Sequence, residues 1–414
     1  MVLSQTYVGL FDHCKKKLIM SKTNKFMIVV YSEATSVGGV TNAISMSLLD
    51  ISRKVRVKLI CRKEPEILKW CNELSNGNVS CQGTALRNHF DIFGWFDVIN
   101  LFRVLRTARN ARVVHFHLHT PFSSIPAIFV VRLFTRARII TTEHYVTQIR
   151  FLRRRKLPIF LSLLREVKIA LQLYLKKLSL KLVWRVIAVS ESNKRFIIAY
   201  FGCLPKDKIE TIPNGIDSTR YSTRQSQSRL RENTKLNIVT IAGLNNQKGH
   251  EYLLKAVPIV ISTVPNAHFL LVGDGHLRGL LEKMARALKI DHHVEFLGWR
   301  TDVPEILADS EIFVLPSLFE GMPLSILEAM ASGKAIVATN VDGTADVMVD
   351  GVTGFLVPPG DPSTLARKII HLLCDPQLRE KFGKEAQMRV INLFSAERMS
   401  LAYADLYQRA LREN

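Results

Sequence analysis

Hydrophobic residues make up 47% of the 414 residues and charged residues 22%, a composition typical of globular proteins that excludes a disordered chain. The length predicts two or three domains, each large enough for its own core. The net charge of +21 at pH 7 calls for a polyanionic partner or surface, such as nucleic acid, acidic phospholipid or a nucleotide diphosphate. Six cysteines without CxxC or ligand-like spacing indicate structural thiols in a reducing compartment, and we interpret the ten-residue recurrence of Cys61, Cys71 and Cys81 as coincidence.

The first 25 residues show no clear periodicity. They contain no apolar run of signal-peptide length followed by a small-residue cleavage site. We therefore predict that residues 1–25 form a disordered extension, or that translation starts upstream of Met20 or Met27, and we do not expect a cleaved signal.

A strand–helix–strand unit follows, with strands predicted over residues 26–31 and 55–60 and a helix over residues 41–50. This order predicts a parallel sheet. Gly38 and Gly39 precede the helix, so their backbone can approach a phosphate or an acceptor closely. A plain tight turn is the alternative interpretation.

Three histidines alternate with apolar residues over residues 112–119, which places His115, His117 and His119 on one face of a strand. Three imidazoles are a potential metal-ligand set. Neighbouring ligands on one strand are poorly placed to converge on one ion, however, and no carboxylate or cysteine accompanies them. We predict no metal site.

A fourth histidine, His144, follows the strand predicted over residues 138–142. A lone histidine after a strand is more often structural than catalytic. Here it lies at the carboxyl end of a parallel strand, where ligands bind in open α/β sheets. The position favours a functional role.

The most basic part of the chain is residues 132–185, which hold 14 Lys or Arg and only two acidic residues, Glu143 and Glu166. Leucines and isoleucines interleave with the basic residues, which is typical of a helix lying in the interface of an anionic membrane. The apolar runs are far shorter than the ~20 residues that span a bilayer. A solvated helix packed on its domain by leucines is the alternative. Nucleic acid is not favoured, because few aromatic residues and no recognition motif are present.

A second strand–helix series begins after a turn at Pro213, Asn214 and Gly215, and we place the domain boundary just before this turn. Its first strand leads into a loop, residues 242–250, ahead of a helix. The further strands predicted in this series cover residues 269–272, 294–297, 312–315, 335–339 and 354–357.

Two glutamates flank the helix that follows residues 312–315. Pro323 suits the start of this helix and Gly333 suits a left-handed cap at its end. The helix start offers free N–H groups and a favourable dipole to an anion. Seven residues separate Glu320 from Glu328, so the carboxylates lie roughly 8–12 Å apart, about the span of a diphosphate. An ordinary βαβ unit with two surface glutamates is the alternative.

This E-x7-E element, with Gly321, Pro323, Ala329 and Gly333 in place, resembles the donor site of the retaining glycosyltransferases of family 4. The turn at Pro213 to Asp217 resembles a recurrent hinge element of the same family, and the resemblance covers nearly all of residues 25–407. It implies an α/β protein of the GT-B fold, with two facing Rossmann-like, doubly wound domains and an interdomain cleft. The implied parts are an acceptor-binding domain over residues 26–210, a nucleotide-sugar-binding domain over residues 211–390, and a C-terminal helix over residues 391–414 that crosses back to the first domain.

The resemblance also implies roles for individual residues. Glu320 would accept hydrogen bonds from sugar hydroxyls, Lys248 would contact the donor diphosphate, and His144 would face the donor sugar. Glu328 would bind the ribose hydroxyls. The implied set for binding the donor or lining the cleft is Gly38, Gly39, Gly243, Asn245, Trp299, Arg300, Gly321, Met322, Pro323, Leu324 and Glu328.

One position departs from the family pattern. The family usually has arginine where this chain has Gly243. Loss of a charged hydrogen bond to phosphate costs roughly 1.5–3 kcal/mol. Asn245, Asn246 or Gln247 would have to compensate, or the donor is held differently.

The resemblance and the charge together predict a peripheral enzyme on the cytoplasmic face of a membrane. It would transfer a hexose from a UDP- or GDP-sugar to a lipid-linked or polysaccharide acceptor, with retention and without a metal ion. The expected partners are the nucleotide sugar, the glycan or lipid-linked acceptor and an anionic membrane surface contacted by residues 132–185. The alternative hypothesis is a nucleotide-sugar-binding GT-B protein with weak or no activity, and a polynucleotide-binding protein ranks last.

Overall fold

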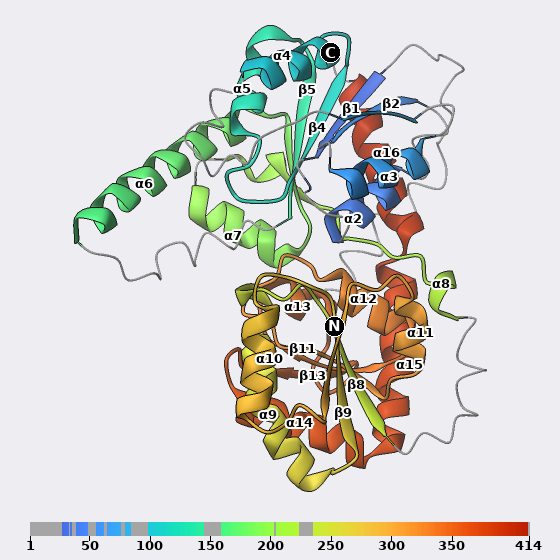
Figure 1. The fold of residues 1–414 in the computed structure, drawn as a ribbon. Helices are drawn as coiled ribbons and strands as arrows, with labels where there is room; N and C mark the ends of the chain where they lie inside the picture. The colour runs from blue at the N-terminus through green and yellow to red at the C-terminus, as the bar shows by residue number, and fades with distance from the viewer. Residues whose placement is uncertain are drawn as a thin grey trace. The chain divides into compact units, whose positions relative to one another are not determined.

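The computed structural model describes residues 27–32, 34, 39–48, 55–61, 64–75, 79–83, 98–144, 159–202, 204–222 and 235–412. The extension predicted over residues 1–25 lies outside the described residues, and so does Gly38. The chain divides into two compact units, each with its own parallel sheet (Figure 1). Unit 1 comprises residues 1–214 and 396–414, and unit 2 comprises residues 215–395.

The sheet of unit 1 has seven parallel strands in the order β3-β2-β1-β4-β5-β6-β7. Val and Ile dominate the central strands, whose side chains are buried on both faces, as expected for a sheet covered by helices on both sides. The strands are β1 (Met27–Ser32), β2 (Arg56–Cys61), β3 (Val79–Gly83), β4 (Val113–Leu118), β5 (Arg138–Glu143), β6 (Arg185–Ala188) and β7 (Ile209–Thr211).

Helices cover both faces of this sheet. One core cluster joins the strands to α2 (Gly39–Leu48), α3 (Pro65–Leu74) and the last helix of the chain, α16 (Ala396–Arg412). The other joins them to α4 (Val98–Ala108), α5 (Ile125–Phe134), α6 (Ile159–Leu182) and α7 (Glu191–Phe201). Ser190 caps α7 by accepting a hydrogen bond from the backbone of Asn193.

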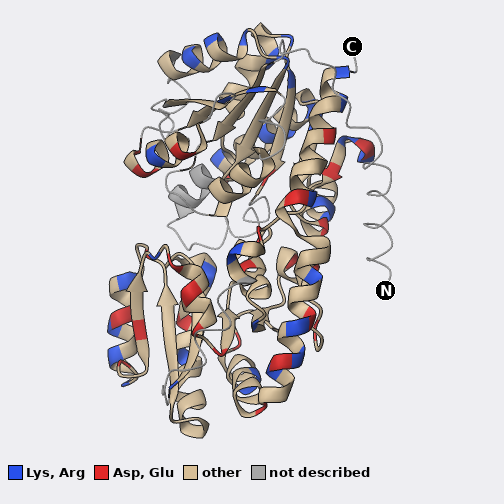
Figure 2. Ribbon diagram, turned by 90° about the vertical axis from the view of Figure 1, so that its right-hand side faces the viewer, with Lys and Arg blue, Asp and Glu red and all other residues tan. Residues whose placement is uncertain are grey.

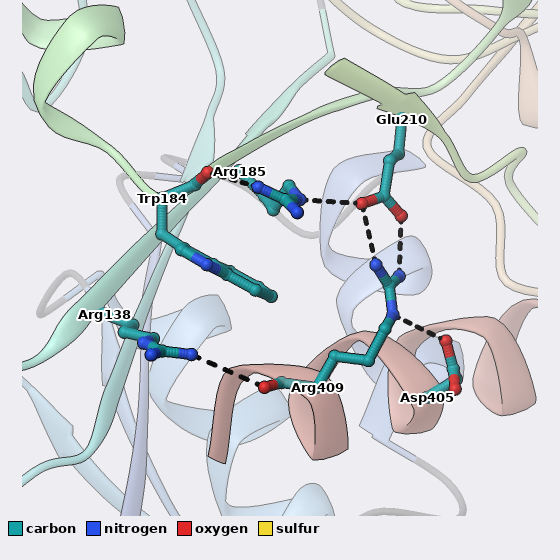
Figure 3. A network of polar contacts seen from close by, with 6 residues as sticks. All are labelled: Arg138, Trp184, Arg185, Glu210, Asp405 and Arg409. Atoms are coloured by element: carbon teal, nitrogen blue, oxygen red, sulfur yellow. Dashed lines mark hydrogen bonds and ion pairs between the residues drawn. The ribbon is translucent and has the colours of Figure 1, made fainter. Parts of the chain in front are cut away.

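Helix α16 is fixed to unit 1 by a buried face and by a polar network. Tyr403 and Tyr407, predicted as a packing face, are both 0% exposed. At the edge of the helix the guanidinium of Arg409 donates two hydrogen bonds to Glu210, at 2.9 and 2.7 Å, and Arg185 donates a third at 3.0 Å (Figure 3). Although partial burial opposes it, the Arg409 guanidinium holds the pKa of Glu210 below its ordinary value.

The sheet of unit 2 has six parallel strands in the order β10-β9-β8-β11-β12-β13. They are β8 (Leu236–Ile241), β9 (Ala267–Val272), β10 (Val294–Gly298), β11 (Ile312–Leu315), β12 (Ala335–Thr339) and β13 (Gly354–Val357). The helices of unit 2 are α8 (Thr219–Ser222), α9 (His250–Thr263), α10 (Arg278–Ala287), α11 (Val303–Ala308), α12 (Leu324–Ala331), α13 (Asp342–Val347), α14 (Pro362–Cys374) and α15 (Pro376–Leu393). One face packs on α9, α10 and α14, and α12 packs on β11, β12 and α15.

The prediction for residues 132–185 needs one correction. Lys176 is not exposed toward a membrane: it is 0% exposed, and its ammonium donates to both oxygens of Glu143 at 2.8 and 2.9 Å. Both groups are taken out of water, so each requires the other. This pair ties the carboxyl-terminal half of α6 to the end of β5. Among the described residues, no helix is both long enough and apolar enough to cross a membrane.

Candidate functional site

The turn and helix after β11 have the geometry that the sequence predicts at both ends. Gly333 has a φ of 65° and follows α12 as its left-handed cap, and the next amide, that of Lys334, donates to Ala329 at 3.0 Å. Pro323 lies at the N-cap of α12, one position before the first helical residue. Gly321, Met322 and Pro323 are buried, so the turn is packed into unit 2. The side chain of Leu324, which begins the helix, is half-buried.

Glu320 is a buried carboxylate, 1% exposed, at this turn. Its Oε1 accepts from the ammonium of Lys248 at 2.5 Å and from the hydroxyl of Ser317 at 2.7 Å. Its Oε2 lies 3.5 Å from the amide nitrogen of Gln247. The three donors fix the rotamer of Glu320 and place a cation beside it, although Lys248 lies 72 residues away in sequence.

The Lys248 loop is held against this turn by its backbone. The amide of Leu318 donates to the carbonyl of Gln247 at 2.7 Å. Gly249 has a φ of 65°, and a Cβ there would lie 2.1 Å from the carbonyl oxygen of Pro316. Only glycine permits both the conformation and this approach. Asn245 caps the short turn over Asn246–Lys248 by accepting from the amide of Lys248 at 3.3 Å.

Glu328, the second glutamate of the pair, is engaged by a residue that the sequence does not single out. The hydroxyl of Tyr221, from α8, hydrogen bonds to its carboxyl group. Burial raises the pKa of Glu328 to about 7, while Tyr221 and Arg220 act in the opposite direction. Glu328 is therefore a carboxyl group that changes charge near neutral pH.

The other predicted donor-binding residues of unit 2 lie after β8 and β10. A Cβ on Gly243 would meet the Nδ2 atom of Asn245 at 3.5 Å and the carbonyl oxygen of Asp274 at 3.7 Å, which are ordinary contacts. Trp299 is 58% exposed, and Arg300 binds Asp302 through two hydrogen bonds of 2.8 and 2.5 Å. Both follow β10, the edge strand, whereas Glu320 and Glu328 follow β11.

Four described histidines of unit 1 form a cluster: His115 and His117 lie in β4, His119 follows β4, and His144 follows β5. All of them except the half-buried His119 are buried. His117 Nδ1 lies 3.1 Å from His144 Nε2, and the two rings are stacked. Burial lowers the pKa of both well below the ordinary value, and the neighbouring imidazoles add to the effect. Both rings are therefore neutral at physiological pH, and one of them donates to the other.

His115 connects this cluster to the last helix. Its Nδ1 lies 2.6 Å from the hydroxyl of Tyr407 and its Nε2 lies 2.8 Å from the hydroxyl of Thr142. His119 pairs with Ser32 at 2.9 Å. Gly39, the described member of the glycine pair, is the exposed first residue of α2. In the part of the chain that the structure describes, no group of three or more His, Cys, Asp or Glu has the arrangement of a metal site.

In comparisons with known proteins, two family models match this chain, each over a different range of residues. A family model described as Glycosyltransferase Family 4 matches residues 48–220, and one described as Glycosyl transferases group 1 matches residues 235–375. The chain is 30% identical to the UDP-Gal:alpha-D-GlcNAc-diphosphoundecaprenol alpha-1,3-galactosyltransferase of Escherichia coli, over 56% of this chain and 62% of that protein. It is 31% identical to the lipopolysaccharide core biosynthesis glycosyltransferase LpsE of Rhizobium meliloti, over 41% and 48%. The chain thus spans about three fifths or less of the curated relatives it matches.

Solved structures match over almost the whole chain. The Anabaena protein Alr3699/HepE, crystallised with UDP-glucose, has a TM-score of 0.75 at 18% identity, over 92% of this chain and 99% of that one. Sucrose-phosphate synthase from Thermosynechococcus elongatus has a TM-score of 0.75 at 19% identity, over 93% and 99%. At this identity the likeness establishes the fold, and the predicted GT-B class of two Rossmann-like domains is confirmed.

Proposed function

Because the chain belongs to glycosyltransferase family 4, we propose that it transfers a hexose from a UDP- or GDP-sugar to a lipid-linked or polysaccharide acceptor, with retention. The single observation that carries the proposal is the buried carboxylate of Glu320 beside the ammonium of Lys248 at the start of α12. Burying the Glu320 carboxylate costs desolvation energy, which the half-buried Lys248 ammonium and the Ser317 hydroxyl offset. Charged groups arranged in this way cluster at functional sites.

The chemistry follows from where each charge lies. The bond between the sugar's anomeric carbon and the diphosphate breaks, which develops positive charge on the ring and negative charge on the leaving oxygen. Glu320 stabilises the ring charge and orients sugar hydroxyls, and Lys248 with the first amides of α12 stabilises the diphosphate. The acceptor oxygen then bonds to the same face of the anomeric carbon, and its proton passes to the departing diphosphate.

We propose that His144 serves the same reaction by hydrogen bonding to the donor sugar, as the family pattern implies. A neutral imidazole suits that task, because it donates and accepts without carrying charge. We also propose turnover without a metal ion, since Lys248 supplies the positive charge needed beside the diphosphate. EDTA treatment is then expected to leave the rate unchanged, and recovery of a lost rate by Mg²⁺ or Mn²⁺ would contradict this part.

A panel of UDP- and GDP-sugars tests the reaction, with release of UDP or GDP as the readout. Glu320→Gln keeps the shape and removes the charge, so turnover is expected to fall by roughly 10²-fold or more. Glu380→Gln is the matched control, because Glu380 is an exposed glutamate of α15 that pairs with Lys384 on the same helix. Equal activity in wild type and Glu320→Gln would refute the assignment.

Gly243 favours a second candidate, a protein that binds nucleotide sugar with little or no turnover. The family's arginine at this position would contact the donor phosphates, and its absence weakens that hold. Tight binding of UDP by calorimetry, with no turnover of any nucleotide sugar in the panel, would select this candidate over the first.

The distribution of charge supports the proposal that the protein binds its acceptor at an anionic membrane. Residues 215–395 hold 19 of the 57 Lys and Arg and 20 of the 36 Asp and Glu, which leaves 38 basic and 16 acidic residues in unit 1. Figure 2 shows both signs mixed along the helices of unit 2. The whole positive excess of the chain therefore belongs to unit 1.

Exposed apolar side chains accompany this charge on three neighbouring helices, since α5 packs on both α4 and α6. They are Ile99, Phe102, Leu133, Phe134, Val167, Leu171 and Tyr174, each more than half exposed. Exposed basic residues lie among them, for example Arg103 and Arg132. Apolar side chains that enter the headgroup region, with basic residues around them, are typical of peripheral membrane contact.

Flotation with vesicles tests this part separately. The protein is expected to float with vesicles containing phosphatidylglycerol and to remain behind with phosphatidylcholine alone. Phe102→Ser with Phe134→Ser should weaken flotation, whereas Leu280→Ser, an exposed leucine of unit 2, should not. Equal binding to both vesicle types would remove the membrane from the proposal and leave the transfer reaction intact.

A further inference from the structure

The ten-residue recurrence of Cys61, Cys71 and Cys81 is not a coincidence of sequence alone, because the fold brings all three thiols together. Cys61 ends β2, Cys71 lies in α3, and Cys81 lies in β3, the edge strand of the sheet. Cys61 Sγ is 2.8 Å from Cys71 Sγ. Cys81 Sγ donates to the carbonyl oxygen of Cys71 at 3.0 Å, and its side chain also contacts that of Cys71.

The register of the strands explains this convergence. Cys81 pairs with Leu59, two positions before Cys61. Because side chains alternate along a strand, Cys61 and Cys81 point to the same face of the sheet. That face is covered by α3, which packs on both strands and places Cys71 between the two strand cysteines.

The three thiols differ in access, and Cys71 and Cys81 also differ in acidity. Cys61 and Cys71 are each 1% exposed, whereas Cys81 is half-buried. Hydrogen bonds with Cys61 and Cys81 raise the pKa of Cys71, and hydrogen bonds from Cys71 and Ser75 lower the pKa of Cys81 to about 7. The most accessible of the three thiols is thus also one whose pKa is lowered, and the thiolate is the reactive form.

We propose that Cys61, Cys71 and Cys81 form a redox site for low-molecular-weight disulfides such as oxidised glutathione, in which Cys81 takes the reagent and Cys61 and Cys71 keep the resulting disulfide. This site is separate from Glu320 and Lys248, and the proposal does not depend on the transfer reaction. It assigns a role to three cysteines that take no part in the proposed glycosyl transfer.

The exchange proceeds in three balanced steps. The Cys81 thiolate attacks one sulfur of glutathione disulfide, and the first glutathione leaves as its thiolate. Cys71 attacks the Cys81 sulfur and releases the second glutathione. Cys61 then attacks the Cys71 sulfur and returns Cys81 as a thiolate. In sum, two protein thiols are oxidised to one disulfide, one glutathione disulfide is reduced to two thiols, and the protons of Cys61 and Cys71 pass to the glutathiones.

Peptide mapping of the wild-type chain tests the proposal directly. The folded protein is incubated with oxidised glutathione, alkylated with N-ethylmaleimide, and digested with trypsin and a glutamate-specific protease. Cleavage after Glu73 is needed, because Cys71 and Cys81 otherwise share one tryptic peptide. We expect a Cys61–Cys71 disulfide with Cys81 alkylated. Full alkylation of all three cysteines, under conditions where the exposed Cys374 becomes glutathionylated, would overturn the proposal.

Two variants separate the roles of the thiols. Cys81→Ser should slow formation of the Cys61–Cys71 disulfide at least tenfold while giving the same product. Cys61→Ser should stop the exchange earlier and leave Cys71 joined to Cys81 or Cys81 joined to glutathione. Cys374→Ser is the matched control and should not alter the rate. An unchanged rate in Cys81→Ser would refute its role as the entry thiol, and the wild-type map remains decisive if a variant fails to fold.

Discussion

The resembled family pattern predicts arginine where this chain has Gly243, and a side chain can begin at this position without a close contact. A Cβ there would meet its nearest neighbours at 3.5 and 3.7 Å. We expect Gly243→Arg to fold normally and to tighten UDP binding by roughly 10- to 150-fold, since a hydrogen bond to a charged phosphate contributes about 1.5–3 kcal/mol. Calorimetric titration with UDP measures this change.

Gly279→Arg is the control for added charge. Gly279 lies in α10, and a Cβ there would meet nothing within 4 Å. This variant should bind UDP as the wild type does. An equal gain in both variants would mean that net charge alone, rather than a phosphate contact at position 243, strengthens binding.

Glu328 predicts a pH dependence of donor binding. Burial raises its pKa to about 7, so the carboxyl group becomes charged as the pH rises through neutrality. A carboxylate accepts hydrogen bonds from ribose hydroxyls better than the protonated acid does. The affinity for UDP should therefore increase from about pH 6 to about pH 8. Stability should change in the opposite sense: a folded pKa above the unfolded value of 4.5 gives stabilisation at low pH that is lost as the pH passes 7.

Two substitutions test whether Glu328 is the group whose titration causes the pH dependence of UDP affinity. Glu328→Gln should flatten the affinity profile, whereas Glu282→Gln, on the surface beside Arg278, should retain it. UDP titrations at three or four pH values suffice. A rise in affinity that survives in Glu328→Gln would assign the titration to another group.

A buried charge pair helps to fix the position of α6, together with the apolar contacts of this helix in its core cluster. Removal of one partner leaves the other charge buried and unpaired, so Lys176→Met should destabilise unit 1 by about 3–5 kcal/mol. Lys177 is the next residue and is exposed, so Lys177→Met should lower the free energy of unfolding by less than about 0.5 kcal/mol. Urea denaturation of the two variants measures the difference. Glu143→Leu combined with Lys176→Met should recover much of the loss, and equal stability of the two single variants would contradict the pairing.

Elements with a local signal could be predicted from the sequence, and those fixed by distant partners could not. Buried strands such as β5 and the cap at Gly333 follow from apolar runs and from glycine's backbone freedom. The short edge strand β3, with the sequence VSCQG, carries no apolar run and was not predicted. The tie from His115 to Tyr407 joins residues 292 positions apart, and Tyr221 meets Glu328 from outside the motif. Such pairs can be predicted only once the order of the strands in the sheet is known.

At the scale of the whole molecule, unit 1 is completed by the end of the chain. Nine residues of α16 are buried, among them Tyr403, Leu406 and Tyr407 at 0% exposure. These side chains pack in a core cluster whose members outside α16 lie between Ile28 and Ile212, and the hydroxyl of Tyr403 lies 3.1 Å from that of Thr142. The core of unit 1 therefore includes a helix that follows the whole of unit 2 in the sequence. The ion pair of Arg409 with Glu210 adds to this attachment, and Asp405, one turn earlier in the same helix, also binds the guanidinium (Figure 3).

A truncation after Ser395 should therefore unfold unit 1 and spare unit 2. The large buried side chains of α16 are Met399, Tyr403, Leu406 and Tyr407. At about 1.5–3 kcal/mol each they contribute about 6–12 kcal/mol, which is comparable to the 5–15 kcal/mol that stabilises a typical domain. Circular dichroism should show loss of one cooperative thermal transition, while UDP binding through Lys248 and Glu328 persists. A chain ending at Arg412, which lacks only Glu413 and Asn414, is the control and should keep both transitions. Two intact transitions in the shorter chain would mean that the core of unit 1 closes without α16.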